Sequence, residues 1–573
     1  MWMRQSRMNR LLSKIKVTAD RHALLWTGLW LIMMAVTLQV RPLLPVDETR
    51  YLAVAWEMWQ NENFLVPHLN GATYSHKPPL LFWLMHLGWF IFGVNDWWPR
   101  LIAPLFGLIN LFLTSSVAKQ LWPSNSGVAT VAPLILLGCL FWTLFTTLTM
   151  FDMLLAFCSL LAILGILRAW QNDHSYSFMI VAIAVGIGLL AKGPAILVAT
   201  LPVALLVPFW TPAQTVGFTG SNGKDNSWKK SWKQWYFNVG VATLGGIVIA
   251  LIWAIPAAIS GGEKYTDAIF WGQSAGRMVN SFAHARPWWW FLAVLPVLLL
   301  PWTIWPATWR SFISLNDIFK DKGIRFCLTW FLPALLTFSC ISGKQLHYLL
   351  PVFPALALIG GRLLVDHHKR SGGQGLWSEY GLHLPAGLFT VLGFFLVLAP
   401  IFAKKTGLLP VVVEIESIWG VILALLAFAL IFICQKTNNL KSRIACLTTL
   451  SVSLIIFLHL SLKPVLDERY NLQVFSEKVR EWQDQGIPLA YLGKYHGMFN
   501  FMGRLETKIV PVGLQHPDLE NWQKANRKGY LIIPVGREHK QVVPVYTQLY
   551  RGRRFIIITV DQSIAYPEII GNP

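Results

Sequence analysis

The sequence predicts an all-α, polytopic membrane protein of about thirteen transmembrane helices with a small C-terminal α/β domain. Charged residues make up 13% of the 573 positions, whereas soluble globular domains carry roughly 25%. Hydrophobic residues make up 54%, and the chain holds 29 Trp and 34 Phe, aromatic residues that are common in bilayer-spanning proteins and, for Trp, at their interfaces. Despite a net charge of +20, this composition excludes an ordinary cytosolic enzyme, a disordered chain and a nucleic-acid-binding protein built from basic patches.

Apolar runs that can cross a bilayer as helices recur through the first predicted domain, residues 1–462. The run 79–94 is short and follows Pro78, so we interpret it as an interfacial or partly embedded helix within a long first outer loop, residues 41–100. The predicted spans are residues 22–40, 100–118, 128–150, 153–170, 178–191, 195–210, 237–259, 288–309, 326–341, 346–364, 384–402, 415–434 and 446–462.

Positive charge predicts the orientation of these spans. The N-terminus is basic from Arg4 to Arg21, and no small-residue cleavage site follows the first apolar run, as in a signal anchor. Cytoplasmic loops carry an excess of Lys and Arg, which places the N-terminus inside. If 79–94 does not cross, the later basic clusters also lie inside, and the odd number of spans places the C-terminal region outside. These clusters comprise Lys119, Lys224, Lys229, Lys230, Lys233, Arg310, Lys320, Lys322, Arg325, Arg362, Lys369, Arg370, Lys436, Lys441 and Arg443.

The second predicted domain, residues 463–573, is more polar. Strand-like runs accompany one helical stretch, which predicts a small α/β domain on the outer face. The runs are 488–492, 509–512, 530–535 and 555–560, and the helical stretch is 474–485. The six cysteines of the whole chain lie within or beside apolar runs without metal-ligand spacing, so we interpret them as small buried apolar side chains.

Two acidic residues of the outer loops stand out. Asp152 lies between Phe151 and Met153 at the mouth of a predicted span, where a carboxylate is costly and commonly functional, although Asp there can also cap a helix. Asp47 precedes a predicted helix over 48–60, and acids are ordinary in a first helical turn. The presence of both acids on one membrane face predicts a site.

Several cations share that face with the two acids. Lys and Arg at a membrane boundary suit an anionic headgroup such as a phosphate, whereas a single cation can also merely anchor the protein to lipid headgroups. The cations are Arg50, Lys77, Lys192, Arg277 and Lys344. Together with the acids they predict a site for a negatively charged lipid headgroup.

Five blocks of sequence, in order over residues 24–361, carry a resemblance to a known family. The chain resembles the bacterial branch of the C-type (GT-C), polyprenyl-phosphate-dependent glycosyltransferases. It is most similar to the transferases that add 4-amino-4-deoxy-L-arabinose to lipid A, and more distantly to protein O-mannosyltransferases. The blocks are Asp47-Glu48-Thr49-Arg50-Tyr51, His76-Lys77-Pro78-Pro79-Leu80, Phe151-Asp152-Met153-Leu154-Leu155, Lys192-Gly193-Pro194 and Lys344-Gln345-Leu346-His347-Tyr348-Leu349-Leu350-Pro351.

The resemblance implies roles for the residues at matching positions. Asp47 matches the first-loop acid at the reacting centre, and Asp152 matches the second-loop acid beside it. The expected donor-phosphate-binding residues are Lys77, Arg50, Arg277 and Tyr348. Supporting roles are expected for Glu48, Tyr51, Tyr74, His76, Lys192, His284 and Lys344.

Two positions depart from the aminoarabinose transferases. His76 stands where they have Glu before Lys-Pro-Pro, and Ser274 stands where they have His before the fourth-loop arginine. That Glu/His pair is associated with a bound zinc, so the resemblance does not carry a zinc site of this design to the chain. His76 and His284 could supply imidazoles, but without a ligand spacing they leave the metal unassigned, and no cofactor is certain.

The resemblance implies inverting transfer of a sugar from undecaprenyl phosphate to lipid A or a related envelope acceptor. The reaction would take place on the periplasmic face of the bacterial inner membrane. The alternative is transfer of a hexose such as mannose from a polyprenyl phosphate to a secreted protein or another envelope glycan. A lipid flippase would instead predict ionisable residues near midspan, where the chain has few. The expected partners are the lipid-linked donor, the envelope acceptor and the bilayer, without nucleic acid.

Overall fold

The computed structural model describes residues 21–172, 175–211, 232–272, 285–313, 318–371, 381–407, 410–435, 439–513, 517–536 and 542–571. Several residues singled out from the sequence lie outside these ranges. They are the basic residues before Arg21, Lys224, Lys229, Lys230, Ser274, Arg277, His284 and Lys436.

A bundle of apolar helices confirms the predicted fold class. Within the described residues, eight helical segments are long and apolar enough to cross a membrane. A further bent pair, with 72° between its halves, forms a broken span or a re-entrant loop. The eight segments contain α2 (Arg21–Val40), α5 (Trp97–Leu121), α8 (Asp152–Asn172), α12 (Trp232–Gly261), α17 (Lys322–Cys340), α18 (Phe353–Arg370), α20 (His383–Thr406) and α23 (Leu440–Arg469). The bent pair is α6 (Ser126–Gly138) with α7 (Leu140–Thr146), and shorter apolar helices are α4 (Leu80–Phe92), α9 (Ser175–Lys192), α10 (Ala195–Leu205) and α22 (Ile418–Gln435).

The predicted span 288–309 is not one continuous helix. It is divided among α15 (Trp290–Leu298), the 3₁₀ turn η3 (Trp302–Ile304) and α16 (Pro306–Ile313). Pro301 and Pro306 lie at the breaks, where a proline lacks the N–H that would continue the helix. The remaining short helical pieces are α11 (Val207–Trp210), α13 (Glu263–Asp267), η2 (Ala268–Gly272), η4 (Ile318–Lys320), η5 (Leu346–Val352) and α21 (Pro410–Val413).

Polar contacts join three predicted inside loops at one end of the bundle. The Trp122 indole and the Arg362 guanidinium both donate to the Asp321 carboxylate, at 2.9 Å each. Lys369 donates to the side chain of Asn125 at 3.0 Å. The loop after α5, the start of α17 and the end of α18 therefore lie together, as the predicted topology requires. We call this group of residues the far end of the bundle.

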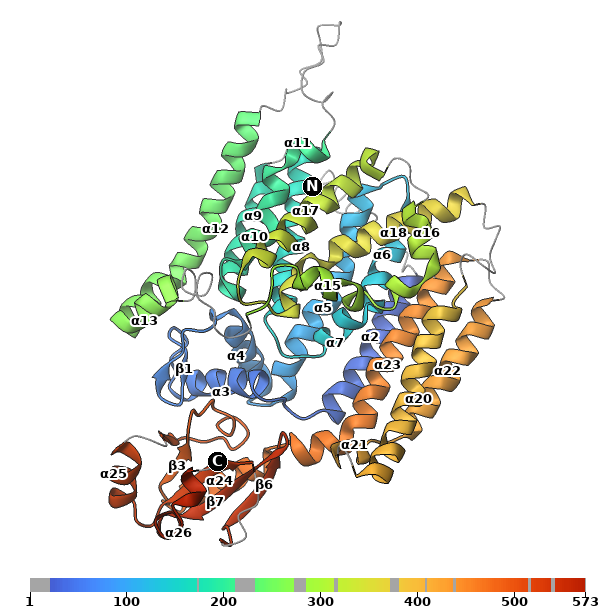
Figure 1. The fold of residues 1–573 in the computed structure, drawn as a ribbon. Helices are drawn as coiled ribbons and strands as arrows, with labels where there is room; N and C mark the ends of the chain where they lie inside the picture. The colour runs from blue at the N-terminus through green and yellow to red at the C-terminus, as the bar shows by residue number, and fades with distance from the viewer. Residues whose placement is uncertain are drawn as a thin grey trace, which may run out of the picture.

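The first long loop and the C-terminal domain lie at the opposite end, below the bundle in Figure 1. The loop contains α3 (Asp47–Gln60), the two-stranded pair β1 (His68–Leu69) and β2 (Ala72–Thr73), and then α4. The predicted helices 48–60 and 79–94 correspond to α3 and α4.

A five-stranded mixed sheet forms the core of the C-terminal domain. Its order is β4-β3-β5-β7-β6, with β3 parallel to β4 and β5, and with β7 antiparallel to β5 and β6. The edge strand β6 was not predicted. The elements are α24 (Gln473–Asp484), β3 (Leu489–Leu492), β4 (Val510–Val512), α25 (Pro517–Ala525), β5 (Tyr530–Val535), β6 (Tyr546–Tyr550), β7 (Arg553–Thr559), α26 (Val560–Ala565) and α27 (Glu568–Gly571).

The C-terminal domain packs directly on the first loop, and the two share one hydrophobic cluster. The ring of Trp89 on α4 stacks on Phe501, with 5.5 Å between ring centroids. The Asn70 side chain forms two hydrogen bonds with the backbone of Ile509, donating at 2.7 Å and accepting at 3.0 Å. Gly497 lies with a left-handed φ of +73°, where an added Cβ would meet Leu69 and Ala53. This close approach requires glycine.

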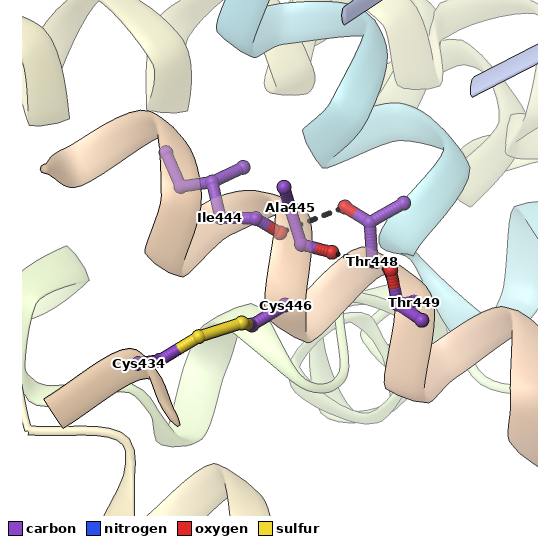
Figure 2. The surroundings of a disulfide bond; sticks show 6 residues. All are labelled: Cys434, Ile444, Ala445, Cys446, Thr448 and Thr449. Atoms are coloured by element: carbon purple, nitrogen blue, oxygen red, sulfur yellow. Dashed lines mark hydrogen bonds between the residues drawn. A yellow bond between two sulfur atoms is a disulfide. The ribbon is translucent and has the colours of Figure 1, made fainter. Parts of the chain in front are cut away.

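Two of the cysteines differ from the expectation of isolated apolar side chains. Cys434 on α22 and Cys446 on α23 are joined by a disulfide (Figure 2). The packing of these two helices against each other brings the two sulfur atoms together, a contact that no sequence spacing announced. Cys139, Cys158 and Cys327 are buried thiols, as expected, whereas Cys340 is exposed at the end of α17.

Candidate functional site

An ion pair joins the second predicted acid to a predicted cation. Asp152 is the first residue of α8, and Lys192 is the last residue of α9. The Lys192 ammonium donates to Asp152 Oδ1 at 2.5 Å, and the two side chains are 11% and 3% exposed, respectively. Because α8 and α9 are packed neighbours of opposite direction, the pair places an anion at one helix N-terminus and a cation at an adjacent C-terminus, where each is favoured.

The residues after Lys192 end α9 at this point. Gly193 has a left-handed φ of +66°, and its N–H donates to the carbonyl oxygen of Leu189 at 2.9 Å, which is how glycine commonly terminates a helix. The Lys192 ammonium, besides pairing with Asp152, lies 5.3 Å from the centre of the Tyr348 ring. The Lys-Gly-Pro block and the fifth-loop tyrosine therefore meet.

The first predicted acid lies at the start of α3, in a different environment. Asp47 forms an ion pair with Arg50, three positions along the helix, and the Asp47 side chain is 50% exposed. Asp47 and Glu48 both occupy the first turn of α3, where the helix dipole favours negative charge. Asp47 is thus accessible, whereas Asp152 is enclosed.

Aromatic rings pack between the segments that carry these two acids. Tyr51 packs edge-on against Phe151, with 5.0 Å between ring centroids, and Phe151 in turn packs against Phe82 at 5.7 Å. The Lys77 ammonium lies 5.6 Å from the centre of the Phe151 ring. Tyr74 packs against Phe82 at 6.3 Å. Lys77 and Tyr74, from the segment before α4, therefore share this aromatic layer with α3.

Electrostatic interactions connect both acids to the same neighbours. Asp152 interacts with Lys192, His347 and Lys77. His347 interacts with Asp47 as well as with Asp152. Contacts and electrostatic interactions thus connect residues that lie far apart in the chain, namely Asp47, Asp152, Lys77, Lys192, Arg50 and Tyr348.

Tyr51 also faces both acids. Burial, and next the Asp47 carboxylate, raises the pKa of the Tyr51 phenol well above its ordinary value, with a smaller contribution from Asp152. The Tyr51 phenol therefore keeps its proton at neutral pH.

Three supporting residues have contacts of other kinds. The His76 ring packs against Tyr74, with 5.3 Å between ring centroids. Lys344 is buried and donates to the carbonyl oxygens of Arg286 and Ile341. Glu48 is buried against Arg41. Lys344 and Glu48 thus secure backbone segments instead of facing the group around Asp152, because each has its hydrogen bonds satisfied by neighbouring protein groups.

Sequence reasoning missed three residues of this region. His347 belongs to the predicted fifth block, and its place between Lys344 and Tyr348 is the sequence signal that marks it. Arg41 is the first residue of the predicted first loop, and no sequence signal marks it as part of the site. His496 comes from the C-terminal domain, and its pKa is lowered by burial and then by Arg50. No sequence pattern linked His496 to α3.

A metal site does not emerge from the described residues, which hold no group of three or more His, Cys, Asp or Glu side chains suited to one. His76 lies among aromatic neighbours, and His284 lies outside the described ranges. Among the described residues, the group consists of two carboxylates, several cations and a tyrosine.

The fold is that of a polytopic membrane protein of the GT-C fold class. The family model of dolichyl-phosphate-mannose-protein mannosyltransferases matches residues 76–217. The chain is similar to the undecaprenyl phosphate-alpha-4-amino-4-deoxy-L-arabinose arabinosyl transferase 2 of Pseudomonas fluorescens. The two are 28% identical over 372 residues, which is 64% of each chain. The corresponding transferase of Edwardsiella ictaluri is 29% identical, over 65% of this chain and 64% of its own.

A solved structure shares the fold over nearly the whole chain. It is the crystal structure of ArnT from Cupriavidus metallidurans bound to undecaprenyl phosphate. The TM-score is 0.68 and the sequence identity is 17%, with 93% of this chain and 97% of that chain covered. The alignments with the two curated relatives span less than two thirds of those relatives' own length, whereas the structural likeness includes the C-terminal domain.

Proposed function

We propose that this chain is a glycosyltransferase. It would move a sugar, with inversion, from undecaprenyl phosphate to an acceptor at the outer face of the bacterial inner membrane, and lipid A is the acceptor we favour. One observation carries the proposal: Asp47 and Asp152 share the neighbours Tyr51 and His347 at the end of the bundle opposite the far end. The named activity of the relatives and the ligand of the Cupriavidus structure support it.

The cations would hold the leaving group. As the glycosidic bond breaks, negative charge develops on the polyprenyl phosphate. Arg50 lies against the Tyr51 ring and Lys77 against the Phe151 ring, so both would contact a headgroup placed beside this aromatic layer. Removing one such electrostatic contact typically costs about 10²–10³ in rate. Tyr348, beside Lys192, would line the same phosphate.

The two carboxylates would divide the remaining work by their exposure. Asp47 is half exposed and would meet the acceptor, acting as general base if that acceptor is a hydroxyl. A lipid A phosphate is already anionic and needs no base, so Asp47 would then position the sugar and stabilise its developing positive charge. Asp152, buried against Lys192, would stabilise the positive charge that develops on the sugar at the reacting centre.

The charge distribution supports an outer-face site. Basic residues near Asp321 gather at the far end, including Arg362 and Lys369, and positive loops face the cytoplasm. Helix α3, which begins at Asp47, lies at the opposite end, beside the C-terminal domain (Figure 1). An undecaprenyl chain in the outer leaflet would present its phosphate at that level.

Mass spectrometry of lipid A from cells with and without the chain tests the proposal. We expect a gain of one pentosamine that depends on the chain and is lost in D47N and D152N, each reducing transfer about a hundredfold or more. The control is D484N, an exposed carboxylate of the C-terminal domain, which should transfer normally. Near-normal transfer by D47N or D152N would overturn the assignment.

A second acceptor class follows from the mannosyltransferase family match over residues 76–217. In that case unchanged lipid A would be accompanied by a lost hexose on secreted proteins or on another envelope glycan. The same membrane fractions, analysed for glycopeptides, distinguish the two acceptors.

A further inference from the structure

Arg41 and Glu48 form a buried ion pair beside the candidate site. Both nitrogens of the Arg41 fork donate to the Glu48 carboxylate, one on each oxygen, with Arg41 Nη2 at 2.9 Å from Glu48 Oε1. The side chains are 2% and 3% exposed. Two parallel hydrogen bonds fix the relative orientation of the two groups, which a single point charge would not.

The same pair also binds the segment that precedes Asp152. Arg41 Nη2 donates to the carbonyl oxygen of Thr147 at 2.9 Å, and the backbone N–H of Thr149 donates to Glu48 Oε1 at 2.7 Å. A further backbone N–H, from Leu44, donates to Glu48 Oε2 at 2.8 Å. The pair therefore connects the start of α3 to the turn that leads into α8.

Arg100 closes the network from α5. Its guanidinium donates to the carbonyl oxygen of Arg41 and, at 3.2 Å, to that of Thr37 at the end of α2. The first and last residues of the predicted first loop are thus joined. The base of α3 is held from α2, α5 and the Thr147–Thr149 turn at once.

We propose that Arg41 and Glu48 are positioning residues that set the separation of Asp47 and Asp152. Asp47 immediately precedes Glu48, and Asp152 follows Thr149 by three positions. With Glu48 locked inward, Asp47 points outward and stays half exposed. The inference rests on the proposed function, because it assigns a purpose to the distance between the two acids.

Stability alone does not account for such a pair. A buried ion pair loses its hydration, and replacing one with well-packed apolar groups is often neutral or stabilising. An apolar pair could not, however, accept the Thr149 N–H or donate to the Thr147 carbonyl. What the ion pair adds is a fixed geometry between two segments, and catalysis is sensitive to misplacements of about 1 Å, which can cost about 10²-fold.

The test compares E48Q, R41K and the double variant with D321N and R362K. The latter change a partly buried Arg–Asp pair at the far end and serve as matched controls. Each protein is purified, normalised for folded material and assayed for sugar transfer well below its melting temperature. We expect E48Q and R41K to lower kcat by about 10²-fold, while KM for the donor stays within about twofold, since Lys77 and Arg50 are unchanged.

The double variant and the controls separate positioning from stability. Because the two residues act as one unit, the double variant should lose no more kcat than the worse single variant. D321N and R362K should lower Tm but keep kcat. Wild-type kcat in E48Q, or an equal loss of kcat in the controls, would overturn the inference.

A readout without turnover keeps the two proposals apart. If the wild-type chain transfers no sugar, the proposed function fails. Deuterium exchange then tests separately whether the Arg41–Glu48 pair holds the start of α3 against the Thr147–Thr149 turn. E48Q should raise amide exchange at residues 147–151 and at the start of α3, and D321N should not. Unchanged exchange in E48Q would show that the Arg41–Glu48 pair does not hold these two segments in place.

Discussion

Lys192 donates to Asp152 across 2.5 Å, so that the C-terminus of α9 neutralises the acid at the N-terminus of α8. Neither residue has an oppositely charged residue beside it in the sequence. The pairing depends on two helices that run in opposite directions and begin or end at the same level. It gives the buried carboxylate a counterion in a place where an unpaired charge would be costly.

Replacing Lys192 with Met should destabilise the protein and abolish transfer, because Asp152 would remain buried without a counterion. Breaking such a pair typically costs about 3–5 kcal/mol, which should appear as a lower Tm in detergent. The double variant D152N/K192M should recover most of the Tm while remaining inactive. A K192M protein with the wild-type Tm would show that the pair contributes nothing to folding.

Asp47 and Asp152 should separate in their effects on stability. D47N removes a carboxylate that is half exposed, so we expect Tm to change little while transfer falls about a hundredfold or more. D152N changes a buried ion pair and should alter both quantities. Thermal unfolding and transfer assays on the two purified variants check this, and a large loss of Tm in D47N would contradict it.

Lys77 should affect the donor more than the fold. K77Q should weaken binding of undecaprenyl phosphate and reduce transfer by about 10²–10³, and K77R should retain part of both because it keeps the charge. The control is K478Q, since Lys478 is an exposed lysine of the C-terminal domain paired with Glu481. Equal donor binding by K77Q and K478Q would remove Lys77 from the site.

The Arg41–Glu48 pair predicts a pH dependence of stability. Burial alone raises the pKa of the Glu48 carboxyl, but Arg41 and the N–H groups of Thr149 and Leu44 outweigh it, so the pKa lies below its ordinary value. The contribution of Glu48 is therefore complete above its unfolded-state pKa, about 4.3, and is lost as the pH falls through the lower folded-state pKa.

The difference in Tm between wild type and E48Q should accordingly be constant from pH 7 to about pH 5 and shrink below about pH 4. Thermal unfolding of both proteins across this range measures it. A difference that grows on acidification would mean that the carboxyl is protonated in the folded protein.

Asn70 should hold the C-terminal domain on the first loop. Asn70 has a left-handed φ of 54°, so N70G tests the two hydrogen bonds to Ile509 without adding backbone strain. We expect N70G to increase proteolytic cleavage within residues 494–509, at a cost of about 1–3 kcal/mol for the lost hydrogen bonds. N70D keeps the acceptor and should be intermediate. Identical cleavage of N70G and wild type would contradict the docking role.

The helices of the bundle could be predicted because their signal is local. The run 384–402 within α20 is almost entirely apolar, and hydropathy alone identifies it. The region 288–309 shows where this fails, since three helical pieces share one apolar run. The strand β6 was missed because it is a short edge strand that carries Thr547 and Gln548, which weakens its apolar pattern.

The site was predictable to the extent that charge is conspicuous beside apolar sequence. Asp152 and Lys192 stand at the ends of apolar runs and were found. Arg41 and Glu48 lie at the two ends of a short connecting segment, and nothing in the sequence distinguishes a buried pair there from an exposed one. Lys344 looked like the other cations, and only its contacts with the carbonyls of Arg286 and Ile341 distinguish it.

The sequence by itself determined a chain that crosses a bilayer many times, and it predicted that Asp47, Asp152 and the cations named with them lie in loops of one face. It could do so because hydropathy and loop charge act over a few neighbouring residues. The tertiary structure decided that Asp152 is buried and Asp47 half exposed. It also decided that Arg41 joins the first loop to the Thr147–Thr149 turn. These outcomes depend on desolvation and on hydrogen bonds between segments about a hundred positions apart, from Arg41 to Thr147, and no local pattern encodes them.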